Sequence, residues 1–164
     1  AFARAEVPQA EVLLEQGLKA NQPEPEVAYY LGVVAMRDDD MKRARTLFER
    51  ELTQYPKHLK SAQALISVHD KKAATALILD VATTALLHNG SNETLLHAKA
   101  QALFNLKEFS ACRLAMDLAL VHHSKSSALI LLDANLLKKE GKPEKGIARF
   151  EEAKAAKRFE DSQK

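Results

Sequence analysis

A spacing of 34 residues recurs along this chain of 164 residues. When the sequence is aligned with itself at that offset, small residues and bulky apolar residues each fall into columns. The four columns are Gly32, Ile66, Ala100 and Ala134; Ala10, Ala44, Ile78, Cys112 and Gly146; Leu14, Phe48, Ala82, Met116 and Phe150; Gly17, Glu51, Ala85, Ala119 and Ala153. Because the phase persists over five rows without an insertion, the sequence predicts one repeated unit that packs on its neighbours.

Each unit has the pattern of a helix hairpin. Two apolar-periodic segments of about 13 to 16 residues are separated by a short polar break such as "RDDD" or "NLKE". Glycine and proline occur only five times each and tryptophan is absent, a composition that favours helix over sheet. Asp40 and Asn92 are placed to cap helices, and Pro143 suits a first helical turn.

The Gly32 and Ala44 columns predict where the two helices of a hairpin touch. A glycine inside a helix costs about 1 kcal/mol relative to alanine, so a glycine kept there indicates close packing. Helix axes approach to about 8 Å only where the contacting side chains are small, and the Phe48 column is expected to fill the remaining gap. The row with Ile66, Ile78 and Ala82 reverses these volumes, so we expect a wider or shifted crossing there.

These rows resemble the tetratricopeptide repeat (TPR) family, whose 34-residue unit carries Leu-Gly in its first helix, Ala, an aromatic and a small residue in its second, and a terminal Pro. The matching residues are Leu31, Gly32, Ala44, Phe48 and Pro56; Leu96, Ala100, Leu103, Phe109, Met116 and Ala119; Ala134, Gly141, Phe150 and Ala153. The resemblance covers almost the whole chain and implies an all-α fold, a right-handed α-solenoid of antiparallel helix hairpins.

The repeat phase divides the chain into about four and a half units. The predicted segments are the second helix of a truncated first repeat (1–22), a repeat (23–56), a degenerate repeat (57–90), two further repeats (91–124 and 125–158) and a polar tail (159–164). Because terminal repeats need a polar outer face, the open ends predict stacking on further repeats or self-association with a second copy.

In TPR arrays the first helices line a concave groove that binds an extended or helical segment of a partner protein. The resemblance therefore implies partner-binding positions at Tyr29, Val33, Met36, Gln63, Ser67, His97, Gln101, Phe104, Asn105, Asn135 and Lys138. Arg37, Asp70, Lys71 and Leu131 fall on the same faces. Exposed aromatic and Met anchors beside amide groups suit peptide recognition, although each residue can equally be ordinary helix surface or packing between repeats.

The resemblance implies a non-catalytic scaffold that binds a segment of a partner protein, within a larger protein or assembly. Two alternatives stay open: a substrate-recruiting region of an enzyme whose catalytic domain lies outside this chain, and a secretion or assembly chaperone. The Lys, Asn and Arg set with which some TPR proteins clamp a C-terminal carboxylate is absent at the corresponding positions. Nothing resembles a phosphate-binding glycine loop, a nucleophile elbow or a paired-carboxylate site, so we expect no enzyme and no cofactor.

Charge and reactive side chains exclude several other classes of site. A net charge of +2 is too small to indicate a nucleic-acid partner. The sequence has no run of 18 apolar residues, so we expect no membrane insertion. The histidines, including His88, His122 and His123, are expected at the solvated surface and not in a metal site, whereas His69 is expected to be a hydrogen-bonded interior residue. The single cysteine, Cys112, is expected to be a buried small hydrophobe. No signal peptide is visible, and the compartment stays open between cytoplasm and periplasm for a chain expected to be soluble.

Overall fold

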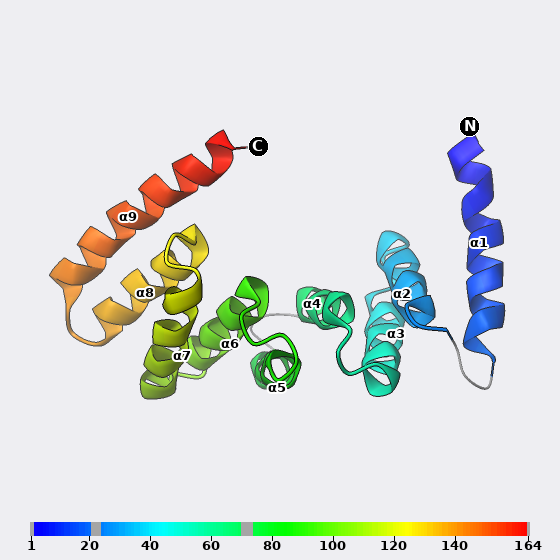
Figure 1. Ribbon diagram of the computed structural model, residues 1–164, viewed down its shortest axis with the longest axis horizontal. Helices are drawn as coiled ribbons and strands as arrows, with labels where there is room; N and C mark the ends of the chain where they lie inside the picture. The colour runs from blue at the N-terminus through cyan, green and yellow to red at the C-terminus, as the bar shows by residue number, and fades with distance from the viewer. Residues whose placement is uncertain (1, 21–23, 70–73, 164) are drawn as a thin grey trace. The chain divides into compact units, whose positions relative to one another are not determined.

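The computed structural model describes residues 2–20, 24–69 and 74–163, and these ranges contain helices and their connections but no strand (Figure 1). The chain forms two compact units, Ala1–Asp70 and Lys71–Lys164.

The first unit contains α1 (Phe2–Leu18), α2 (Val27–Arg37), α3 (Met41–Gln54) and α4 (Leu59–Val68). Successive helices pack on one another, α1 on α2, α2 on α3 and α3 on α4. Side chains of α3 also tie it to α1, because Arg43 Nη2 lies 2.6 Å from Glu15 Oε1 and Arg50 Nη2 donates to the Leu18 carbonyl at 2.7 Å. The helix of the predicted half repeat is thereby fixed to the first complete hairpin.

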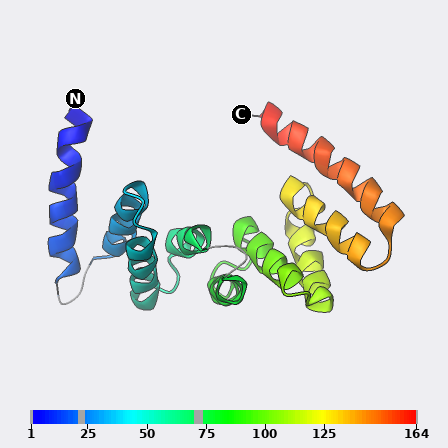
Figure 2. The same cartoon turned by 180° about the vertical axis from the view of Figure 1, so that it is seen from behind.

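The second unit contains α5 (Thr75–Leu86), α6 (Glu93–Asn105), α7 (Phe109–His122), α8 (Ser127–Lys139) and α9 (Pro143–Ser162). Each helix packs on the next, α8 lies against α9 over much of its length, and α6 also contacts α8 (Figures 1 and 2). The core of this unit joins α6, α7 and α8. Its buried members are Leu96, Ala100, Leu103, Cys112, Ala115, Met116, Ala119, Leu129, Leu132 and Leu136.

The small-residue columns lie where the helices of a hairpin meet, as predicted. A methyl group at Gly32 would stand 2.4 Å from Phe48 Cε1, so the ring of the third column fills the space that this glycine leaves. In the next complete hairpin, Cys112 Sγ lies 3.3 Å from the Ala100 carbonyl oxygen. A methyl group at Gly146 would stand 2.9 Å from the Ala134 carbonyl oxygen.

The hairpin turns share one backbone conformation that recurs with the repeat. Asp39, Lys107 and Gly141 have φ values of 62°, 64° and 77°. In each turn the following N–H reaches back to a carbonyl five residues earlier, as in Glu108 to Leu103 at 3.0 Å, which is the Schellman geometry that ends a helix. After the first of these turns Asp40 caps α3, because its side chain accepts from the Arg43 N–H at 3.0 Å as expected. Asn92 and Pro143 also lie at the helix starts predicted for them.

The unit boundary divides the predicted repeat at residues 57–90. Its first helix, α4, belongs to the first unit and its second helix, α5, to the second. This is the row in which Ile66 and Ile78, both buried, replace the small residues of the contact columns. At the C-terminus α9 continues to Ser162, so the predicted polar tail 159–164 begins inside a helix.

Candidate functional site

The predicted partner-binding positions of the first unit lie on α2 and α4, but not all of them are exposed. Tyr29, expected as an exposed anchor, is partly buried, and its ring centroid lies 5.9 Å from that of Phe48 and 5.3 Å from that of His58. The Tyr29 side chain, on α2, therefore packs against α3 and the start of α4. Val33 is 40% exposed, so this position of α2 is open to a partner.

The remaining predicted positions of this unit divide in the same way. Met36, another expected anchor, is partly buried, as is Gln63. Ser67 is exposed, and its hydroxyl donates to the Ala64 carbonyl one turn earlier at 2.7 Å. Asp70 and Lys71, which the sequence places on the same face, lie outside the described residues.

On α6 of the second unit the predicted residues form a polar face beside an internal aromatic contact. Gln101 Nε2 donates to Asn105 Oδ1 at 2.9 Å, so these two amides lie one turn apart on one side of the helix. Phe104 is partly buried, with its ring centroid 5.7 Å from that of Phe109 in an edge-to-face contact against the core. His97 is partly buried one turn before Gln101.

On α8 the structure places Asn135 in solvent and Lys138 over the next helix. The Lys138 ammonium lies 5.6 Å from the centre of the Phe150 ring, and its stem is in the space next to Gly146. Lys138 thus helps to pack α8 on α9 while its charge stays accessible. The predicted binding role of these positions remains a prediction; the expectation that Tyr29, Met36 and Phe104 are exposed is wrong, because neighbouring helices cover part of each side chain.

One repeat position is consistently accessible on the first helices. The residues at this position, which we call the amide column, are Val33, Ser67, Gln101 and Asn135. Val33, Ser67 and Asn135 are exposed and Gln101 is half-buried. Within the second unit α6 contacts α8, so Gln101 and Asn135 belong to neighbouring helices.

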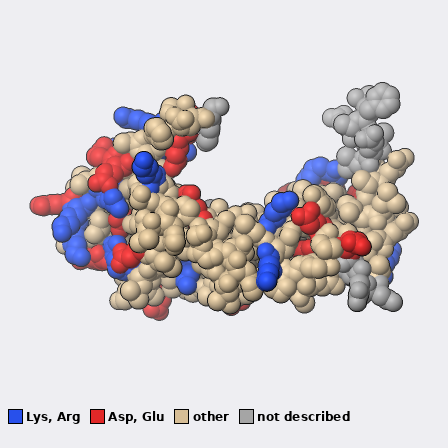
Figure 3. Space-filling model, in the orientation of Figure 1, with Lys and Arg blue, Asp and Glu red and all other residues tan. Residues whose placement is uncertain are grey.

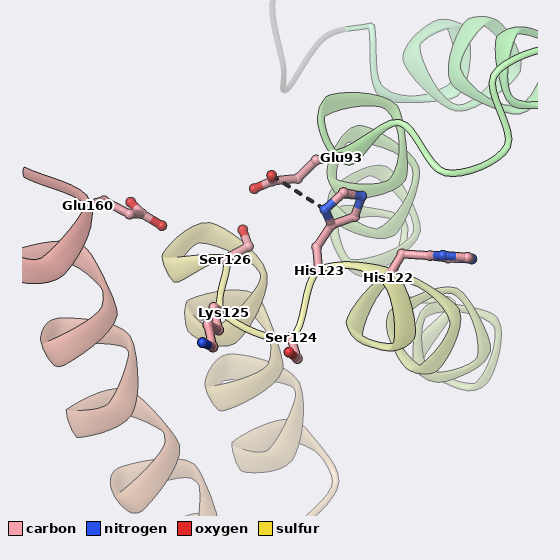
Figure 4. Close-up of a pocket in the computed structure, with 7 residues that line it drawn as sticks. All are labelled: Glu93, His122, His123, Ser124, Lys125, Ser126 and Glu160. Carbon is pink, nitrogen blue, oxygen red and sulfur yellow. Dashed lines mark ion pairs between the residues drawn. The ribbon is translucent and has the colours of Figure 1, made fainter. Parts of the chain in front are cut away.

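A polar hollow of about 370 Å³ lies at the connection between α7 and α8 in the second unit (Figure 4). Its lining residues are Glu93, His122, His123, Ser124, Lys125, Ser126 and Glu160. His123 Nε2 lies 2.6 Å from the Ser91 carbonyl oxygen and its Nδ1 lies 3.7 Å from Glu93 Oε2. His123 therefore holds the end of α7 to the start of α6, whereas His122 points away from this contact and is exposed (Figure 4).

Glu160, on the other side of this hollow, also makes hydrogen bonds that hold helix ends together. Glu160 accepts from the backbone N–H of Ser127 at 2.9 Å and from its hydroxyl at 2.7 Å. These hydrogen bonds stabilise the ionised form and lower the pKa of Glu160. Among the described residues no three His, Cys, Asp or Glu side chains converge to hold a metal ion. The hollow joins helix ends and offers no ligand set.

A second, apolar hollow of about 420 Å³ opens between α8 and α9. We call it the C-terminal groove, and its lining residues are Ser127, Ala128, Leu131, Phe150, Ala153, Lys154, Lys157 and Arg158. Leu131 is 40% exposed in its wall. The Lys154 ammonium stands 4.8 Å from the centre of the Phe150 ring, so a cation lies at the edge of the apolar floor.

The two reactive side chains that the sequence placed inside the protein are both buried. Cys112 is fully buried, and burial raises the pKa of its thiol to about 11, which leaves almost no nucleophilic thiolate at neutral pH. His69 is 8% exposed, and burial together with Arg45 lowers its pKa. The expectation that His69 is hydrogen-bonded is wrong for Nε2, which has no partner among the described residues.

A buried carboxylate that the sequence analysis missed ties three helices of the second unit together. Asp133 on α8 is 5% exposed, and its two oxygens lie 2.7 Å from Arg113 Nη1 on α7 and 2.8 Å from Arg149 Nε on α9. Arg113 also pairs with Glu140 at 2.8 Å, and these contacts raise the pKa of Arg113. The signal was present in the sequence as a single acidic residue inside the apolar run "LILLDANLL".

Comparison with known proteins identifies the fold. The sequence matches no protein-family model and no curated protein. Several solved structures are similar over nearly the whole chain, among them structures of MamA, a tetratricopeptide-repeat protein.

Three of these MamA structures show the extent of the similarity. A crystal structure of MamA aligns with a TM-score of 0.79 at 12% identity, over 98% of this chain and 94% of its own. MamA from residue 41 to its end, from Desulfovibrio magneticus RS-1, aligns with a TM-score of 0.76 at 17% identity, over 98% and 90%. The C2221 form of MamA AMB-1 aligns with a TM-score of 0.72 at 23% identity, over 94% and 91%. At these identities the similarity establishes the fold, the helical-repeat α-solenoid of TPR proteins.

Proposed function

We propose that this chain, with its TPR fold, is a non-catalytic scaffold that binds a segment of a partner protein on the exposed face of its first helices. The observation that carries the proposal is the amide column, Val33, Ser67, Gln101 and Asn135. This position is exposed or half-buried in each of these first helices, whereas the position directly before it, Gly32, Ile66, Ala100 and Ala134, is buried in all four, so a segment bound there meets the repeat without disturbing the core. Carboxamide groups can hydrogen-bond both N–H and C=O groups of an extended backbone.

The chemistry of the other polar side chains supports a binding role over a catalytic one. The thiol of Cys112 is protonated and enclosed, and the histidine and carboxylate of the polar hollow are engaged with helix ends. Asp133 is held by two guanidinium groups in the interior. These groups stabilise the scaffold, and none of them is presented to a substrate.

Membrane insertion is not part of the proposal. No helix within the described ranges is both long and apolar enough to cross a bilayer. The proposed partner is a protein or peptide segment that reaches the first-helix faces from solvent.

Site-specific photo-crosslinking tests the proposal. A photo-reactive residue is placed at Gln101 or Asn135 in the full chain, and the crosslinked proteins from the source cells are identified by mass spectrometry. We expect the same partner at both positions and no crosslink from Thr84, an exposed residue of the second helix α5. A partner captured equally from Thr84, or different proteins from Gln101 and Asn135, would contradict the proposal.

Alanine substitutions provide the matched affinity measurement. Tyr29 and Phe104 are unsuitable because alanine there removes internal ring contacts. The double substitution Gln101→Ala with Asn135→Ala removes the two carboxamides of the column and, inside the protein, only the exposed hydrogen bond from Gln101 to Asn105. We expect it to weaken binding of the crosslinked partner by about tenfold, as expected for the loss of two polar contacts. The control pair is Thr84→Ala with Ser110→Ala, exposed positions on α5 and α7.

A further inference from the structure

The C-terminal groove is the position at which a further helix would pack, as the preceding repeat of the same unit shows. Phe150 and Ala153 of the groove lie 34 residues after Met116 and Ala119. Met116 and Ala119 are fully buried in the core that α8 completes with Leu129, Leu132 and Leu136. At the groove no described helix takes the place of α8, so Phe150 is only partly buried and Leu131 is 40% exposed.

This internal comparison specifies the shape of an occupant. The side chains with which α8 covers the preceding repeat are spaced i, i+3 and i+7, which is one face of an α-helix. The α9 wall of the groove repeats the α7 wall of that core, because Phe150 and Ala153 stand where Met116 and Ala119 are, and on α8 an apolar Leu131 stands where the preceding repeat has His97. A helix with leucine-type residues at that spacing therefore matches the groove in shape.

The rim of the groove specifies the charge of the occupant. Lys154, Lys157 and Arg158 stand where the preceding repeat has Leu120, His123 and Ser124. Charged side chains of the second unit gather over the end formed by α8 and α9, as Figure 3 shows. The change from one repeat to the next adds cations beside an apolar floor.

The acidic neighbours of this rim only partly neutralise it. Lys154 pairs with Glu151 and Lys157 with Asp161, but the side chains of Glu151 and Asp161 are 64% and 53% exposed. Exposed pairs of this kind contribute only about 0 to 1 kcal/mol, so they can exchange partners readily. Arg158 has no ion pair among the described residues, and a carboxylate from outside can bind its guanidinium group with two hydrogen bonds.

We propose that the C-terminal groove binds an amphipathic helix of a partner protein, with leucine-type side chains at i, i+3 and i+7 and with carboxylates along the flank that faces Arg158. Apolar contact with Leu131 and Phe150 supplies affinity, and the cationic rim selects an acidic flank. Leu131 lies one turn before Asn135 of the amide column on α8, whereas Phe150 and Arg158 lie on α9, so Arg158→Glu tests this groove without altering the proposed first-helix site.

The probe is a peptide of about 15 residues, stapled into a helix because isolated helices of this length are marginally stable. It keeps the three leucines with which α8 covers the preceding repeat, and carries Glu at the positions that flank the leucine face. A second peptide carries Lys at those positions. Binding of each fluorescent peptide to the full chain is measured by anisotropy, and we expect the Glu peptide to bind at least about tenfold more tightly than the Lys peptide.

Two substitutions locate the binding. Leu131→Asp is expected to weaken the Glu peptide at least about tenfold, whereas Leu114→Asp, at a 73% exposed leucine of α7, leaves binding unchanged. Arg158→Glu is expected to weaken the Glu peptide and strengthen the Lys peptide, whereas Lys107→Glu in an exposed turn changes neither. Circular-dichroism melts of the four variants establish that each is folded.

Three results would overturn the proposal. The first is no binding of either peptide to the folded chain, and the second is equal binding of both peptides that Arg158→Glu does not change. The third concerns a second copy of this chain, because Val12 and Leu13 of α1 are 55% and 68% exposed. If sedimentation shows self-association that Leu131→Asp abolishes and Leu114→Asp does not, another copy occupies the groove.

Discussion

Alanine at Gly32 isolates the close packing on which the repeat depends. A methyl group there would stand 2.4, 2.8 and 2.9 Å from Cε1, Cδ1 and Cζ of Phe48. The ring cannot move aside freely, because Phe48 is fully buried and its centroid lies 5.9 Å from that of Tyr29. Either the ring or the separation of α2 and α3 must change.

Two opposing terms set the expected magnitude. Replacing glycine by alanine in a helix interior stabilises the folded state by about 1 kcal/mol. Forcing a methyl group into a filled core costs about 1 to 3 kcal/mol, and contact at 2.4 Å with a confined ring places Gly32→Ala in the upper part of that range. We therefore expect Gly32→Ala to lower the free energy of unfolding by about 1 to 2 kcal/mol.

Shortening the side chain of Phe48 should reverse the sign of the stability change caused by Gly32→Ala. Phe48→Leu removes the ring atoms Cε1 and Cζ, and by itself costs about 1 to 2 kcal/mol in lost packing. In that background the methyl group at Gly32 loses its contacts with Cε1 and Cζ, and the flexible leucine Cδ atoms can rotate away from it, so Gly32→Ala should stabilise by up to about 1 kcal/mol. The double-mutant cycle then gives a coupling energy of about 2 kcal/mol or more between the two positions.

The free energies of this cycle can be measured by tyrosine fluorescence during urea unfolding, because the signal comes from the unit that contains Gly32 and Phe48. The chain has no tryptophan, and its three tyrosines, Tyr29, Tyr30 and Tyr55, all lie in the first unit. Gly17→Ala is the matched control, because a methyl group there would meet Val27 at an ordinary 3.6 Å and should not destabilise. If Gly32→Ala stabilised the wild-type chain as much as it stabilises Phe48→Leu, the packing argument would be refuted.

Three further predictions concern buried polar groups. Asp133→Asn should lower the free energy of unfolding by about 2 to 3 kcal/mol, because two guanidinium groups lose a shared carboxylate. Urea unfolding followed by circular dichroism measures this change. The exposed control, Asp117→Asn, should change the free energy of unfolding by less than about 0.5 kcal/mol. Native Cys112 should react with a disulfide reagent at least about a hundredfold more slowly than in urea, since burial suppresses both access and the thiolate; equal rates would contradict its burial. Because the pKa of His69 is lowered on folding, the unfolded chain binds more protons as pH falls below 6.5, so stability should decline there; His69→Leu should lessen this decline relative to wild type in tyrosine-detected urea titrations.

The repeat made much of the fold predictable, because periodicity determines which face of each helix is buried. The contact of Ala100 with Cys112, and the caps at Asp40 and Asn92, follow from side-chain size and hydrogen-bonding capacity. The positive φ of Lys107 does not follow from its side chain. Of the equivalent residues, Gly141 and, less strongly, Asp39 have types that favour this conformation.

The candidate site was less predictable, since a helical face does not specify which neighbours reach it. Tyr29 and Phe104 lie on the predicted faces, yet rings from adjacent elements cover them in part. Asp133 lies in an apolar run, and its burial depends on Arg113 and Arg149, which are distant in sequence. Such pairings depend on the three-dimensional packing of helices and leave only a weak trace in the periodic pattern.

Positions that depart from the repeat pattern therefore indicate where one repeat makes contacts that the others do not. A repeated position keeps its residue type as long as its structural neighbours are repeated, and changes where they are not. Leu120, partly buried against the core, becomes the exposed Lys154 one repeat later, where no described helix takes the place of α8. If Lys154 only faced solvent, any polar residue there would suffice. The apolar character that Phe150 keeps from Met116, and the change from His97 to the 40% exposed Leu131, are better explained by a bound helix, because solvation alone would favour polar side chains at both positions.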